Sequence, residues 1–127
     1  GVRVIVEKMD AEIESAGLAR ATLQTDVELK LRQAGIRVLS EAGGSFLALY
    51  VNVYAPRPRL GLYAFSIRLE LWQRVVLERN PAVTLATGTW SIGGVGMAPS
   101  DQLSTVREYV RDYVDKFINA WLSVNPK

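Results

Sequence analysis

Apolar and polar residues alternate regularly from Gly61 to Glu78, in the sequence GLYAFSIRLELWQRVVLE. Successive side chains of a β-strand point to opposite faces of the sheet, so this alternation predicts one half-buried strand. The apolar positions are Tyr63, Phe65, Ile67, Leu69 and Leu71, and the intervening positions include Ser66, Arg68, Glu70, Trp72 and Arg74. The apolar face must be covered, and we expect the rest of the chain to cover it.

Four further stretches are typical of strands. They are Val2 to Glu7, Ile36 to Ser40, Phe46 to Tyr54 and Ala82 to Met97. The Gly-Gly turn within Glu41 to Ser45 favours a hairpin between the second and third strands. In the last stretch neither face is plainly apolar, and its small residues favour close approach by a helix or a ligand. Its cluster of Gly93, Gly94 and Gly96 predicts a bulge or a frayed end.

Two stretches have helical periodicity. Apolar residues recur at helical spacing from Ala21 to Ala34, and Gly35 follows in the position of a left-handed C-terminal cap. A second amphipathic helix is predicted from about Asp101 to Leu122. The polar segment from Asp10 to Gly17 reads as a loop with about one helical turn.

The predicted order is strand, helix, four strands, helix, within a single domain spanning residues 1–127. Two amphipathic helices and a two-faced sheet predict a two-layer α+β sandwich, with both helices on one face of a mixed, mostly antiparallel sheet. The last helix would cover about 33 Å, whereas an unbroken strand from Leu62 to Leu77 would span about 50 Å. The hairpin tip, roughly Gln73 to Val83, should therefore project beyond the helices or be covered by a partner subunit.

Composition restricts the chemistry. Hydrophobic residues make up 49% of the 127 residues and charged residues 22%, which is ordinary globular composition, and the net charge of +2 is too small to indicate nucleic-acid binding. The chain has no Cys and no His, which excludes disulfides, thiol nucleophiles, imidazole bases and Cys or His zinc sites. No cofactor or metal is expected, and no apolar run approaches the roughly 20 residues of a membrane helix. Because strand character already begins at Val2, we expect a preceding segment, for which an export signal is one candidate.

Carboxylates are the remaining candidates for catalysis. Asp10, Glu12 and Glu14 lie close together in one polar segment, which could be a site for a hard cation or an acid–base pair. Their spacing lacks the glycine and the distal Glu of an EF-hand loop, so a solvated acidic loop is favoured. The glycines before the last helix lack the Gly-Lys-Ser or Gly-Lys-Thr of a phosphate loop, which argues against nucleotide binding.

The second face of the sheet is predicted to combine aromatic residues with arginines. Aromatics interleaved with arginines suit stacking on single-stranded nucleic acid, but the order of elements does not fit an RNA-recognition motif. Exposed aromatic patches more often mark a protein interface. The residues predicted for this interaction face are Tyr50, Tyr54, Arg68, Trp72, Arg74 and Trp90, with Phe46 beside them.

Three segments carry a resemblance. They are Thr25 to Ile36 (TDVELKLRQAGI), Thr87 to Gly96 (TGTWSIGGVG) and Phe117 to Lys127 (FINAWLSVNPK). They are similar to a group of small bacterial proteins that are made with export signals and have no established activity. The resemblance implies a periplasmic or cell-envelope location, while the composition leaves a cytoplasmic one open.

The order of elements also resembles, more loosely, the lipopolysaccharide-assembly lipoprotein of the outer membrane and the N-terminal domain of the Tol–Pal propeller protein. Both are non-enzymatic parts of the envelope, which implies peripheral association with it. Neither shares a residue-level motif with this chain, and the chain has no cysteine to carry a lipid. No site residue is therefore transferred.

Three functions remain as hypotheses. The first is a non-catalytic envelope domain that binds a protein partner, a second copy of itself or an amphipathic ligand through the open sheet face and the hairpin tip. The second is a small hydrolase or lyase that uses the carboxylates of Asp10, Glu12 and Glu14. The third, which the low net charge disfavours, is binding of single-stranded nucleic acid.

Overall fold

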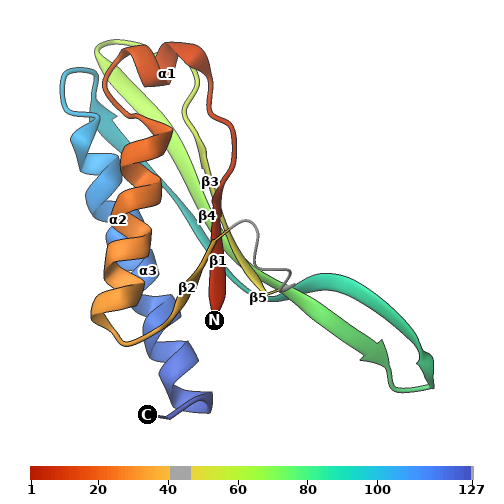
Figure 1. Cartoon of the computed structure of the whole chain (residues 1–127). Helices are drawn as coiled ribbons and strands as arrows, with labels where there is room; N and C mark the ends of the chain where they lie inside the picture. Colours follow the sequence, from red (N-terminus) through yellow and green to blue (C-terminus); the bar gives the residue numbers. More distant parts are fainter. Residues whose placement is uncertain (41–46, 127) are drawn as a thin grey trace.

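Five strands form one sheet, and two long helices cover one of its faces (Figure 1). The computed structural model describes residues 1–40 and 47–126. In chain order the elements are β1 (Val2–Val6), α1 (Ala11–Ser15), α2 (Arg20–Gln33), β2 (Val38–Leu39), β3 (Ala48–Tyr54), β4 (Leu62–Leu77), β5 (Asn80–Pro99) and α3 (Ser104–Val124). The predicted α+β class and the predicted order are confirmed, with α1 as the single helical turn expected near Asp10.

The sheet is mixed, as predicted. Its strand order is β2-β1-β3-β4-β5, and β1 is parallel to both β2 and β3, while β3, β4 and β5 are antiparallel neighbours. The predicted hairpin between the second and third strands is wrong, because β1 lies between β2 and β3 and pairs with each of them. The residues of the expected turn, 41–45, and Phe46 lie outside the described residues.

The alternation along β4 builds the centre of the core. Its five apolar positions are 0–7% exposed, and they pack with the buried faces of β1, β3, α2 and α3. The residues in question are Tyr63, Phe65, Ile67, Leu69 and Leu71. Burial of apolar side chains of this size stabilises the fold by about 1.5–3 kcal/mol for each residue.

Helix α2 ends where the sequence predicted. Gly35 has φ +82°, a conformation that glycine adopts without steric cost. The amide of Ile36 donates to the carbonyl of Leu31 at 2.9 Å, and the amide of Gly35 donates to the carbonyl of Arg32 at 3.0 Å. These two bonds form a Schellman cap, and the chain then turns back toward β1 to form β2.

Helices α2 and α3 run side by side in the same direction (Figure 1). Near the start of α3, the guanidinium of Arg107 donates from Nε and Nη2 to the two carboxylate oxygens of Asp26, at 2.9 and 3.1 Å. One to two turns further along, Lys30 pairs with Asp115. These two ion pairs link α2 to α3 in a parallel arrangement.

The β4–β5 hairpin extends past the helices, which confirms the prediction from element lengths (Figure 1). We call residues 73–87 the arm. Among its apolar side chains, Val76 is 57% exposed, Leu85 41% and Val83 40%. In the described chain the arm is thus a two-stranded ribbon with apolar residues open to solvent, and such ribbons are at best marginally stable in isolation.

The small residues of β5 allow close packing of neighbouring side chains, as expected. The bulge, however, does not lie at the glycines. A Cβ on Gly94 would lie 2.2 Å from the hydroxyl of Tyr113, and one on Gly96 would lie 2.6 Å from the ring of Phe65. One register shift falls between Leu71 and Trp72 of β4, where β5 carries the extra residue Thr89, and a second lies near the hairpin tip, between Val76 and Leu77.

Candidate interaction surfaces

The sheet face opposite the helices carries most of the predicted interaction residues. Tyr50 and Trp72 are half-buried there, and their rings meet edge to face with centroids 6.1 Å apart. Tyr54 lies on the same face and is 63% exposed. The inward positions Leu49, Val51 and Val53 alternate with these residues along β3, which fixes the orientation of the aromatic side chains.

The arginines of this face lie on β4. Nε of Arg68 donates to Oε2 of Glu70 at 3.0 Å, so an internal carboxylate compensates that charge. Glu70 also covers Gly88, where a Cβ would lie 2.3 Å from Oε1. Arg74 is exposed at the base of the arm. Because one guanidinium already has an anionic partner, this face is less suited to binding an external anion than the sequence indicated.

Trp90 does not belong to this face, and the prediction that placed it there is wrong. Its ring packs edge to face on Phe117 of α3, with centroids 5.3 Å apart, so it lies on the helix side. The cause is the bulge. Trp90 pairs with inward-facing Leu71, but Gly88 pairs with outward-facing Trp72, and the extra residue Thr89 reverses the alternation between them. Gln73 forms a hydrogen bond to the bulge residue, donating from its Nε2 to Oγ1 of Thr89 at 2.7 Å.

Two strongly exposed apolar residues of the open face were not predicted from the sequence. Val95 is 84% exposed and Met97 is 60% exposed. They pair with Ser66 and Ala64 of β4, and Ser66 in turn pairs with Tyr54 of β3. We call Tyr54, Leu62, Val95 and Met97 the apolar strip. The available signal was the absence of Asp, Glu, Lys and Arg from Asn80 to Pro99, which leaves both faces of β5 without a charge.

A groove lies on the helix side, between the end of α3 and the base of the arm. Its volume is about 360 Å³. Trp90 and Trp121 line it, together with Leu47, Leu71, Phe117 and Val124. Its size is at the lower end of the range for small-molecule sites, and its walls are largely apolar, with Gln73 and Asn125 as polar groups.

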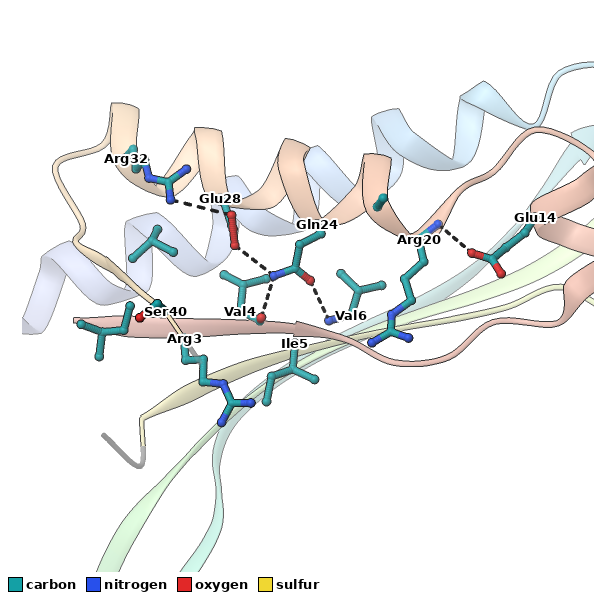
Figure 2. Close-up of a pocket in the computed structure, with 13 residues that line it drawn as sticks. Arg3, Val4, Ile5, Val6, Glu14, Arg20, Gln24, Glu28, Arg32 and Ser40 are labelled. Atoms are coloured by element: carbon teal, nitrogen blue, oxygen red, sulfur yellow. Dashed lines mark hydrogen bonds and ion pairs between the residues drawn. The ribbon is translucent and has the colours of Figure 1, made fainter. Parts of the chain in front are cut away.

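A larger cleft of about 710 Å³ follows the outer edge of β1 (Figure 2). β2 pairs only with Val2 and Arg3, so it leaves the next residues of β1 without a strand on that side. Gln24 of α2 replaces that strand. Its Nε2 donates to the carbonyl of Val4 at 2.7 Å, and its Oε1 accepts from the amide of Val6 at 3.2 Å.

Charged side chains that line this cleft also form hydrogen bonds and an ion pair within the protein. Nε2 of Gln24 donates to Glu28 at 3.0 Å, and Glu28 is 3.7 Å from Arg32. Glu14 accepts from the amide of Arg20 at 3.1 Å, as Figure 2 shows. Gln24 therefore joins α2 to β1, and Glu14 joins α1 to the start of α2, so these polar groups of the cleft make structural hydrogen bonds.

The three carboxylates considered for catalysis are exposed. Asp10 caps α1, accepting from the amide of Glu12 at 3.0 Å. Glu12 accepts from Arg57 at 3.2 Å and raises the pKa of that guanidinium, mainly through the hydrogen bond. A carboxylate dyad for acid–base catalysis requires burial to separate its pKa values, and these side chains lack it. Within residues 1–40 and 47–126 no cluster of three or more acidic residues could hold a metal ion.

In the described part of the chain, no helix combines the length and the apolar character needed to cross a bilayer. No protein-family model matches the chain, and no curated protein sequence matches it.

Three solved structures that are similar to the chain are bacterial lipoproteins. One is a minor lipoprotein from Acinetobacter baumannii, with 12% identity over 97% of this chain and 93% of that chain and a TM-score of 0.45. The rare lipoprotein B of Shewanella oneidensis is 14% identical over 97% of this chain and 96% of its own, with a TM-score of 0.44. A lipoprotein from Neisseria meningitidis is 15% identical over 94% and 99%, with a TM-score of 0.44.

These likenesses confirm the expected loose resemblance to a bacterial lipoprotein. At such identities and TM-scores, the function of this chain has to be argued from its own residues.

Proposed function

We propose that the chain is a non-catalytic cell-envelope domain that binds a protein partner through the open sheet face and the arm. The apolar strip carries this proposal. Val95, Tyr54 and Met97 are 84%, 63% and 60% exposed and lie in adjacent cross-strand rows of one sheet. Exposed apolar side chains that are grouped in this way mark interaction sites more often than isolated ones do.

The arm supports the same proposal. Its strands present Val76 on the open face and the neighbouring pair Val75 and Leu85 on the other, so a partner could enclose the ribbon from both sides. The covered ribbon would gain the packing that a two-stranded hairpin lacks by itself. The envelope location rests on the resemblance of three sequence segments to exported bacterial proteins.

Site-specific photo-crosslinking in the native bacterium tests this function. A photoreactive phenylalanine analogue replaces Tyr54 or Trp72 on the open face, or Val76 on the arm. The matched control replaces Leu29 of α2, which is an apolar residue with 51% exposure on the helix side. We expect a discrete crosslinked species from the first three positions and none from Leu29. Equal crosslinking at all four positions, or none at the first three, would contradict the proposal.

The groove beside Trp90 favours a second candidate, the binding of an amphipathic ligand with a single alkyl chain. Two indole rings and a phenyl ring form an apolar wall there, and Gln73 and Asn125 add polar groups to the lining. An alkyl chain could lie along the rings while its head group stays in solvent.

Tryptophan fluorescence with lysophosphatidylcholine, below the concentration at which it forms micelles, tests this candidate. Trp72→Phe keeps only Trp90 and Trp121, which line the groove, whereas the Trp90→Phe, Trp121→Phe double variant keeps only Trp72. Binding in the groove should shift the emission of the first variant to shorter wavelength and leave that of the second unchanged. A shift confined to Trp72 would place the ligand on the open face and overturn the groove as its site.

A further inference from the structure

Strand β5 forms one edge of the sheet over its full length of 20 residues. In the described chain only β4 pairs with it, so alternate amide and carbonyl groups of its backbone are directed away from the sheet. Native edge strands are usually protected from further pairing by charges, prolines or short length. β5 has no charged residue, and its prolines stand at the ends, Pro81 and Pro99.

The regular part of this edge runs from Trp90 to Ala98. The bulge residue Thr89 limits it on one side and Pro99 on the other. Gly94 lies at its midpoint. We propose that two copies of the chain pair through this segment, antiparallel about a two-fold axis at Gly94, and form one continuous sheet. The proposal is independent of the partner protein inferred above.

The side chains of the segment complement themselves in this register. Each large residue would lie opposite a small one, so neither face would be overfilled. The pairs across the axis are Trp90 with Ala98, Ser91 with Met97, Ile92 with Gly96, Gly93 with Val95, and Gly94 with its own copy. Since the segment has no charge, the pairing opposes no like charges, which would be destabilising directly across two strands.

A second copy would cover exposed apolar side chains on the open face and the half-buried Tyr113 on the helix face. On the open face, Val95 would meet the second copy's Val95 diagonally, at about 7 Å, and the two apolar strips would become continuous. On the other face, α3 contacts both β4 and β5. With strands about 4.8 Å apart, the two α3 helices would lie about 10 Å from each other, which is the spacing of packed helices. Tyr113, which lies over Gly94, would then be covered.

Light scattering coupled to size-exclusion chromatography, over a range of concentrations, measures the dimer. Val95→Lys brings two ammonium groups together near the axis and should weaken association at least about tenfold. The control is Val76→Lys, which adds the same charge to an exposed apolar position on the same sheet face but on the arm. A monomer at all concentrations, or a dimer equally sensitive or insensitive to both variants, would overturn the proposal.

Crosslinking keeps the test decisive if Val95→Lys fails to fold. The chain has no cysteine, so Val95→Cys with a short bis-maleimide reports only on this contact. We expect rapid covalent dimer formation from Val95→Cys and none from Val76→Cys, because the arms of an antiparallel dimer point in opposite directions. Failure of Val95→Cys to crosslink, or comparable crosslinking of both, would show that the copies do not meet at Gly94.

Discussion

Trp90 of β5 and Phe117 of α3 meet edge to face, with ring centroids 5.3 Å apart and planes at 65°. This contact joins the sheet to the last helix at the base of the arm. Replacing Trp90 with Ala removes a half-buried indole and exposes Phe117, so we expect the free energy of unfolding to fall by about 2–4 kcal/mol. Urea denaturation followed by circular dichroism measures the change.

Trp72→Ala is the matched control, since Trp72 is also half-buried but lies on the open face against Tyr50. Loss of one edge-to-face pair at a solvent-facing site should cost about 1 kcal/mol. Similar losses for the two variants, or a larger loss for Trp72→Ala, would contradict the assignment of the two indoles to opposite faces.

The central strand could be predicted because a strand under two helices must be apolar at every second position. That pattern identified the alternate residues from Tyr63 to Leu71 as core and placed both helices on one face of the sheet. The difference between strand and helix lengths predicted that the arm projects beyond the helices. The same reasoning oriented Tyr50, Tyr54, Arg68 and Trp72 correctly, since β3 and β4 alternate without interruption in this region.

The wrong predictions arise where the alternation of apolar and polar residues does not determine how strands pair. Thr89 is a small polar residue between Gly88 and Trp90, so nothing in the pattern marks it as the extra residue that turns Trp90 toward α3. The Gly-Gly turn favoured a hairpin, but a turn motif does not reveal that β1 occupies the place between β2 and β3. Gln24 could not be predicted, because its role depends on β2 ending after Leu39.

Gln24 provides a test of how α2 protects the edge of β1. Replacing it with Leu removes the partners of the Val4 carbonyl and the Val6 amide. Leaving two buried or half-buried backbone groups unpaired should lower stability by about 1–3 kcal/mol. Native-state hydrogen exchange should show faster exchange of the Val6 amide, which has lost its acceptor.

Gln33, which is exposed at the end of the same helix, is the control for that substitution. Gln33→Leu should change stability by less than about 0.5 kcal/mol and leave the exchange of Val6 unaltered. If Gln24→Leu also left the Val6 amide protected, the side chain would not act as a substitute strand.

Two glycines of β5 should respond differently to the same added methyl group. At Gly96 the new Cβ would contact three atoms of the Phe65 ring, the nearest at 2.6 Å, and Phe65 is only 3% exposed. Because a core ring cannot move freely, Gly96→Ala should cost about 1–3 kcal/mol. Thermal or urea unfolding measures the loss.

At Gly88 the obstacle is the carboxylate of Glu70, the end of a flexible side chain on the open face. Glu70 can swing aside, so Gly88→Ala should stay within about 0.5 kcal/mol of the parent. A double variant with Phe65→Leu should recover part of the loss at Gly96 but none at Gly88. Equal costs at both glycines would refute the distinction between core and surface contacts.

Asp26 and Arg107 form the part-buried ion pair between α2 and α3, with side chains 13% and 34% exposed. Arg107→Ala leaves the carboxylate without its two donors, and we expect a loss of about 1–2 kcal/mol. Lys30→Ala, which breaks the more exposed pair with Asp115, should cost less than about 1 kcal/mol. Equal losses for these two variants would contradict the stronger role of the two-pronged pair.

The pH dependence of this pair follows from the pKa of Arg107, which the hydrogen bond to Asp26 raises above its ordinary value. A group whose pKa is raised by folding contributes fully below its unfolded-state pKa, and the contribution is lost only as the pH rises through the folded-state value. For an arginine both values lie far above neutral. The stability difference between the parent and Arg107→Ala should thus stay constant from about pH 7 to about pH 10. Denaturant titrations across that range measure it, and a difference that shrinks within the range would show that another group supplies it.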